Sequence, residues 1–186
     1  LEEIKHIAEL GFDYVELGIE IPGGAPELLL ENKDKILNLF KKFESPPLAH
    51  TAWWIDFGSG YEHVRRGWVE EAKMTIDVAK KLNIKKINFH FHSIGLRVAY
   101  YKKYHKGILL NMIKSLKEVV SYAHSKDMIV ILENSPIKKE VVGIKEYKFV
   151  IDNVPKLKVH LDIAHAFIEN GMEVIKDYLF TFKNKL

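Results

Sequence analysis

Short apolar runs alternate strictly with longer amphipathic segments, and this alternation constrains the fold more than any other feature of the sequence. Five runs rich in β-branched and aromatic residues predict strands, at about 12–20, 48–54, 84–92, 128–133 and 158–162. Six segments with apolar residues at helical spacing predict helices, at about 1–10, 26–43, 62–82, 107–124, 143–153 and 173–182. Strands that alternate with helices form βα units, so we expect an α/β fold with a parallel sheet and right-handed crossovers.

Polar side chains stand where each predicted strand ends. These are Glu20, His50, His90 or His92, Glu133 and Asp162. In a doubly wound sheet ligands gather at one switch point, whereas in a (β/α)8 barrel every strand contributes to one ring, so five contributing strands favour the TIM-type (β/α)8 barrel. Because a full barrel takes about 250 residues, we expect residues 1–186 to be a single partial barrel domain. About one unit would be missing at the front and two at the back.

The composition limits the kind of site that the chain can build. No cysteine is present, which excludes disulfides and thiolate ligands and leaves His, Asp and Glu as the strong metal ligands. The net charge of +3 is dispersed, which permits a nucleic-acid partner without demanding one. No apolar run approaches the roughly 20 residues of a membrane span, and residues 1–5 lack the layout of a secretory signal. We therefore expect a cytoplasmic protein with no membrane partner.

Asp162 and His165 are three residues apart where a strand would pass into a loop, so both side chains can turn toward one point. This spacing favours a metal site built from nitrogen and oxygen. Each candidate also has a purely structural interpretation. Asp162 can cap a following helix, His165 can be a hydrogen-bonded side chain, and Glu133 can belong to a salt bridge. His50 and His90 can be hydrogen-bonded core histidines.

Four motifs occur in order along the chain: Leu48–Ala49–His50, Asn88–Phe89–His90, Leu132–Glu133–Asn134–Ser135, and the run from Val159 to Phe167. Together they resemble the xylose-isomerase-like barrel superfamily. That superfamily joins sugar and sugar-phosphate isomerases and epimerases with apurinic/apyrimidinic (AP) endonucleases of the endonuclease IV type. The resemblance covers the chain from the first helix to the sixth, and it implies that the first strand and strands seven and eight are absent.

The resemblance implies a role for each matched residue. Glu133 is similar to the carboxylate that ligates or bridges metal and that, in the isomerase branch, acts as acid/base beside a carbonyl. Asp162 resembles the next metal ligand, and His165 a residue that contacts substrate oxygens or a further metal. His50 and His90 fit the positions that complete a multinuclear zinc site with Glu133 in the endonuclease branch. The implied cofactor is a divalent metal: Zn, Mn, Co or Mg.

Further residues are candidates for substrate binding. His92 stands where the family usually has a small residue, so whether His90 or His92 is the ligand stays open. Glu16 lies near a strand end, where partial burial beside a lysine is the alternative. Trp53 and Trp54 are candidate walls of a sugar pocket, and core packing is the alternative interpretation for at least one of them.

Three functions fit these features. The first is a metal-dependent sugar or sugar-phosphate isomerase or epimerase that moves a proton through an enediolate and has a small-molecule sugar as its partner. The second is a zinc-dependent AP endonuclease similar to endonuclease IV, which alone would have DNA as a partner. The third is a non-catalytic barrel fragment. Dispersed charge and the lack of a long basic loop favour the first, while His50 together with His90 favours the second. A homo-oligomer is left open.

Overall fold

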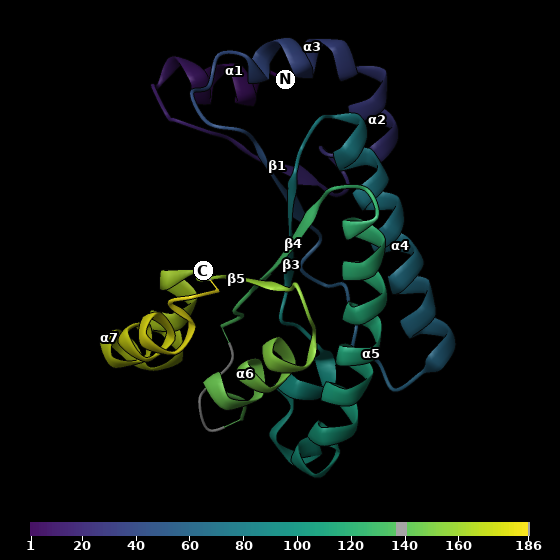
Figure 1. Cartoon of the computed structure of the whole chain (residues 1–186), viewed down its shortest axis with the longest axis vertical. Coiled ribbons are helices and arrows are strands. Elements are labelled where there is room, and N and C mark those ends of the chain that lie inside the picture. Colours follow the sequence, from purple (N-terminus) through teal and green to yellow (C-terminus); the bar gives the residue numbers. More distant parts are fainter. Residues whose placement is uncertain (137–140, 186) are drawn as a thin grey trace.

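The computed structural model describes residues 1–136 and 141–185, and a sheet of parallel strands lies at its centre (Figure 1). The strands are β1 (Glu16–Ile19), β2 (Leu48–Thr51), β3 (Lys86–His90), β4 (Ile129–Glu133) and β5 (Lys158–His160). Each lies inside its predicted range, and four are clearly shorter. The run over 12–20, for example, enters the sheet only at Glu16. Phe12 and Tyr14 belong to the same apolar pattern, but both are exposed and precede the strand.

Helices connect these strands. They are α1 (Glu2–Glu9), α2 (Pro26–Glu31), α3 (Lys33–Phe40), α4 (Glu62–Lys81), α5 (His105–His124), α6 (Ile144–Asn153) and α7 (Ile163–Phe182), with the 3₁₀ helices η1 (Ile94–Arg97) and η2 (Ala99–Tyr104) before α5. The single helix predicted over 26–43 is two helices that meet at Asn32, whose side chain donates to the Leu28 carbonyl at the end of α2. Among the described residues, no helix has the length and apolar character needed to cross a membrane.

The last helix starts earlier than its apolar pattern predicts. Asp162 caps the first turn, so α7 begins at Ile163 rather than near residue 173. The backbone leaves helical geometry at Asn170 and Gly171, where φ of Gly171 is 71°, a value that glycine adopts without strain. The spacing of apolar residues in the sequence predicted only the part of α7 that follows this break.

The strand order follows the chain order, β1-β2-β3-β4-β5, and every neighbouring pair is parallel. A doubly wound sheet reverses its order at a switch point, so this sequential order fits a barrel and excludes the alternative. Helices α2, α4, α5 and α6 form a continuous outer layer, since α4 contacts α2 and α5, and α5 contacts α6. The structure confirms the predicted α/β fold of barrel type.

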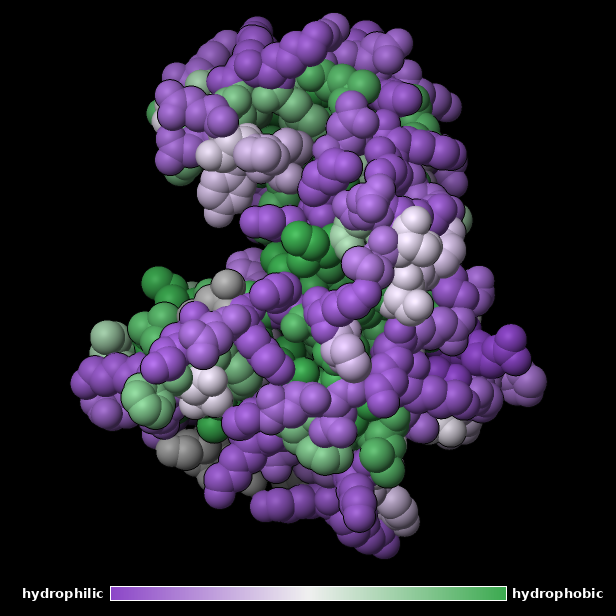
Figure 2. Space-filling model, viewed as in Figure 1, coloured by the Kyte–Doolittle hydropathy of each residue, from purple (hydrophilic) through white to green (hydrophobic). Residues whose placement is uncertain are grey.

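Alternate residues of a strand meet different surroundings. Ile87 and Phe89 of β3 are fully buried in the apolar core between the sheet and the helices. Asn88 and His90 point to the opposite, inner face of the sheet, where both lie against Glu133. Figure 2 shows the molecule hollowed between the end that carries α1 and the end that carries α7. The strands therefore deliver polar side chains to a concave inner face.

Asn134 fastens the carboxyl end of β4 to the end of β5. Its side chain is buried; Nδ2 donates to the Asp162 carbonyl at 3.0 Å, and Oδ1 accepts from the Asp162 backbone N–H at 2.8 Å. A side-chain amide offers the same donor and acceptor as a peptide group, so this pair continues the strand pairing by one step. Asp162 is thereby held at the same edge of the sheet as Glu133.

Replacing Asn134 by alanine should destabilise the fold, because the Asp162 N–H would lose its partner and the Asp162 carbonyl would keep only the Ala166 N–H of α7. We expect Asn134→Ala to lower the free energy of unfolding by about 1–3 kcal/mol, measured by urea denaturation. Asn153→Ala is the matched control, since Asn153 donates only to the Phe149 carbonyl on the exposed surface of α6. We expect the control to stay within about 0.5 kcal/mol of the parent. Equal losses in the two variants would contradict the role of Asn134.

Candidate functional site

Glu133, the last residue of β4, places a carboxylate at the carboxyl edge of the sheet and is only 4% exposed. The register pairs it with His90 of β3 on one side and His160 of β5 on the other. The Asn88 amide donates to Glu133 Oε2, and His165 Nδ1 lies 3.1 Å from Oε1. Among the described residues, no lysine or arginine pairs with this carboxylate. Its partners are imidazoles and one amide.

His90 is buried against Glu133 and His50. Its Nε2 lies 3.5 Å from Glu133 Oε2, and its ring meets the His50 ring edge-on, with 4.8 Å between centroids. Burial, followed by the charges of neighbouring histidines, lowers the pKa of His90 to about 3. The imidazole is therefore neutral near pH 7, which is the form that binds metals. Its Nδ1 has no hydrogen-bond partner within the described chain.

Asp162 and His165 approach each other where α7 begins. Asp162 Oδ1 accepts from the His165 backbone N–H at 2.7 Å, while Oδ2 lies 3.8 Å from His165 Nδ1. The same Nδ1 is 2.9 Å from the Asn134 carbonyl oxygen and close to Glu133. Because carbonyl and ionised carboxylate oxygens only accept, these neighbours favour the tautomer that carries its proton on Nδ1. Capping of α7 uses one oxygen of Asp162 and leaves the other available to a ligand.

Two overlapping groups of side chains have the spacing of a metal site. One is His50, His90 and Glu133, the other is Glu133, Asp162 and His165, and in each the ligand atoms lie within 4.8 Å of one another. Two ligands about 2.1 Å from one tetrahedral zinc lie about 3.4 Å apart. The 3.5 Å between His90 Nε2 and Glu133 Oε2 matches that spacing and exceeds a good hydrogen bond. The nitrogen and oxygen donors therefore fit a divalent ion, and Glu133 belongs to both groups.

A pocket of about 240 Å³ opens onto these residues. It is lined by Trp53, His90, Arg97, Ser135, Pro136 and His165. Trp53, which is 48% exposed, forms one wall and packs edge-on against His92 with 5.3 Å between ring centroids. His92 is buried, and burial together with the charge of Arg97 lowers its pKa. Since His90 and His165 line this pocket, a molecule bound in it would touch both groups of candidate ligands.

The other predicted residues lie in different positions. His50 Nδ1 is 4.0 Å from Glu20 Oε1, so Glu20 is the carboxylate beside it. Glu16 is the first residue of β1, and its carboxylate is close enough to interact with the site: burial raises its pKa, and the charges of His50 and His160 lower it. Trp53 and Trp54 are both exposed, so the interpretation of one of them as core is wrong. Trp54 lines a separate groove between the start of α4 and the start of α5.

His92 is outside both groups of candidate metal ligands formed by the described residues, whereas His90 belongs to one. The alternation of β3 puts the two on the same side, but the chain leaves the sheet after His90. His92 instead accepts a hydrogen bond from Arg97 Nε at 3.2 Å. His90 thus lies next to Glu133, and His92 lies against Arg97 and Trp53, so the geometry favours His90 as the candidate ligand.

Sequence reasoning missed three features of this region. Asn134 directly follows the strand-end Glu133, and that adjacency is the signal by which its bridging role could have been found. Arg97 lies in the connection after β3, where no periodic pattern identifies a functional residue. His105 has polar neighbours in the sequence, and the structure places it buried at the start of α5.

Comparisons with known proteins agree with this architecture. The "Probable endonuclease 4" of Aquifex aeolicus (strain VF5) is 29% identical over 162 residues, which is 84% of this chain and 55% of that protein. The fructoselysine 3-epimerase of Shigella flexneri is 26% identical over 195 residues, which is 98% of this chain and 67% of that protein. The chain thus spans between about half and two thirds of the length of these relatives.

The crystal structure of a D-tagatose 3-epimerase-like protein superposes with a TM-score of 0.77 at 24% identity, covering 94% of this chain and 66% of that one. This likeness concerns the fold. A family model described as "Xylose isomerase-like TIM barrel" matches residues 4–185. With five parallel strands in barrel order and a match over nearly the whole length, the chain belongs to the xylose isomerase-like TIM-barrel family.

Proposed function

We propose that this protein is a metal-dependent isomerase or epimerase that moves a proton on a sugar or sugar phosphate. The observation that carries the proposal is the buried Glu133 carboxylate, which has no lysine or arginine partner among the described residues and adjoins a small pocket. The epimerase named among the relatives supports the same reaction class. Because the chain spans only part of those relatives, the whole reaction is a proposal.

Glu133 is suited to act as the base. Removing a proton from a carbon beside a carbonyl requires an acceptor within about 3 Å of that proton's carbon and a stabilised oxygen to receive the electron pair. The carboxylate takes the proton, the C–H electrons form the C=C bond, and the carbonyl π electrons move to oxygen, which gives an enediolate. Return of the proton to the neighbouring carbon moves the carbonyl and completes an isomerisation, whereas delivery of a proton to the opposite face of the same carbon completes an epimerisation.

The remaining side chains would hold and orient the reactants. Asp162 and His165 with Glu133, or His50 and His90 with Glu133, could hold a divalent ion. When bound, such an ion supplies Lewis acidity to a substrate oxygen. Where the ion is held by His50, His90 and Glu133, His165 Nε2 is available to a substrate hydroxyl. Asn134 keeps His165 oriented by accepting from its Nδ1.

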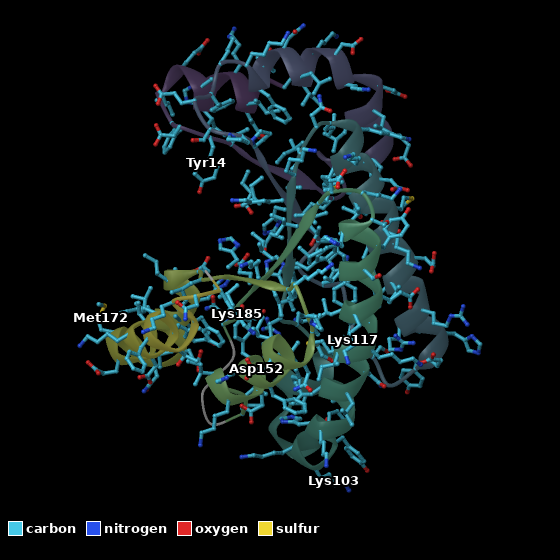
Figure 3. The ribbon with its side chains drawn as sticks, viewed as in Figure 1. Tyr14, Lys103, Lys117, Asp152, Met172 and Lys185 are labelled. Carbon is cyan, nitrogen blue, oxygen red and sulfur yellow. The ribbon has the colours of Figure 1, made fainter. Side chains whose placement is uncertain are left out.

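A second candidate is hydrolysis of DNA at abasic sites. The specific observation in its favour is the group formed by His50, His90 and Glu133, which would add a second ion beside the one held by Asp162 and His165. The expectation that no long basic loop follows a strand also needs correction. Residues 93–106 carry four basic side chains and no acidic one, and Figure 3 shows Lys103 at the outer tip of this connection.

The third alternative, a non-catalytic barrel, has less support. That reading requires the strand-end carboxylates to be neutralised by salt bridges. In the described part of the chain, Glu133 and Asp162 contact imidazoles and backbone amides rather than lysine or arginine. Carboxylates left with such partners favour a bound cation or substrate.

Metal binding gives the first test. We expect Glu133→Gln to lower the affinity for Zn²⁺ or Mn²⁺ at least about tenfold, because it removes the charge that both groups share, measured by isothermal titration and elemental analysis. Glu173→Gln is the matched control, since Glu173 pairs with Lys176 on the surface of α7. His90→Asn should lower the number of bound ions only if His50, His90 and Glu133 hold one, and should leave an ion held by Glu133, Asp162 and His165 in place. Unchanged metal content in Glu133→Gln would contradict the site.

Turnover gives the second test. In heavy water the protein should introduce deuterium at the carbon beside the carbonyl of a ketose or ketose phosphate, followed by NMR. Loss of the base should slow this exchange at least about 100-fold in Glu133→Gln, the size expected for acid–base catalysis. Cleavage of an abasic DNA duplex is measured in parallel. Cleavage without any exchange would replace the first function with the second.

A further inference from the structure

Arg97 at the end of η1 brings a positive charge into the pocket that holds the candidate metal ligands. It is exposed, and it lines the same pocket of about 240 Å³ as His90 and His165. This volume has room for a small molecule, and it is below the roughly 300–1,000 Å³ of sites for drug-sized ligands. A cation at the wall of this pocket is close enough to interact electrostatically with a ligand bound there.

Two aromatic side chains hold Arg97 in place. Its Nε donates to His92 Nδ1 at 3.2 Å, and its guanidinium carbon lies 5.9 Å from the centre of the Trp53 ring. His92 and Trp53 also contact each other. The guanidinium is therefore oriented before any ligand arrives, and the entropy cost of fixing it on binding is reduced.

The outer nitrogens of Arg97 are left for a ligand. Within the described residues, Nη1 and Nη2 have no hydrogen-bond or ion-pair partner. The carboxylate of Asp56, whose charge raises the pKa of His92, accepts a hydrogen bond from the Gly58 N–H through Oδ1. Arg65 provides the contrast. Its Nε and Nη2 bind both oxygens of Glu62, and its Nη1 binds Ser115, so all its nitrogens serve the structure.

We propose that Arg97 binds the phosphate group of a phosphorylated sugar and so selects sugar phosphates over free sugars, an inference that rests on the function proposed above. The planar fork of a guanidinium matches two oxygens of a phosphate. The sugar carbons would then extend from Arg97 toward Glu133, because His90 and His165, which flank that carboxylate, line the same pocket.

The test is binding of a six-carbon polyol and of its terminal phosphate monoester, neither of which has a carbonyl to react, to the metal-loaded protein by isothermal titration. We expect the parent to bind the phosphate ester about 10–100-fold more tightly than the polyol. Arg97→Met should erase this difference and leave the weaker polyol binding unchanged. Arg97→Lys should retain part of it, because charge remains while the fork is lost. Arg66→Met, an equal change at an exposed arginine of α4, should behave like the parent.

Several outcomes overturn the assignment. A phosphate preference that survives in Arg97→Met places the anion elsewhere, and equal weakening of both ligands assigns Arg97 only the support of His92 and Trp53. Loss of abasic-duplex binding in Arg97→Met with polyol-phosphate binding unchanged also overturns it, in favour of a phosphodiester. Deuterium exchange without phosphate preference would leave the proposed reaction standing and remove this inference. Phosphate preference without exchange would do the reverse.

Discussion

Burial of the Glu133 carboxylate is the constraint on which the rest of the site depends. An ionised carboxylate removed from water needs donors or a cation, and in the described chain it has one amide donor and three nearby imidazoles. An amide and imidazoles compensate a negative charge less completely than a lysine or arginine would. The site is therefore electrostatically arranged for a positive group that arrives from outside the protein, and a divalent ion fits that need.

The parallel register converts this constraint into a site. Glu133 stands between His90 and His160 because neighbouring strands end at the same level. Asn134 then extends the β4 and β5 pairing by one step and fixes Asp162, whose side chain both caps α7 and faces His165. The same few residues thus support the fold and the chemistry, so a change at Asn134 is expected to affect both stability and metal binding.

A second layer surrounds the pocket and bears on selectivity. Trp53, His92 and Arg97 contact one another at its wall, and all three belong to connections after strands rather than to strands. Barrel enzymes commonly vary such connections while keeping the strands, which lets one scaffold act on different substrates. This division agrees with a family whose named members include both an endonuclease and sugar epimerases.

The sequence by itself determined the order of strands and helices, the barrel type and the carboxylate and imidazole residues at the strand ends. Alternating apolar patterns and strand-end polar residues are local signals in the sequence, and the four motifs added the resemblance to the barrel superfamily. Only the tertiary structure decided that His90 rather than His92 meets Glu133, that Asp162 caps α7 as well as facing the site, and that Arg97 enters the pocket. These depend on where each strand leaves the sheet and how its connection packs, and such distances between remote residues have no local signature in the sequence.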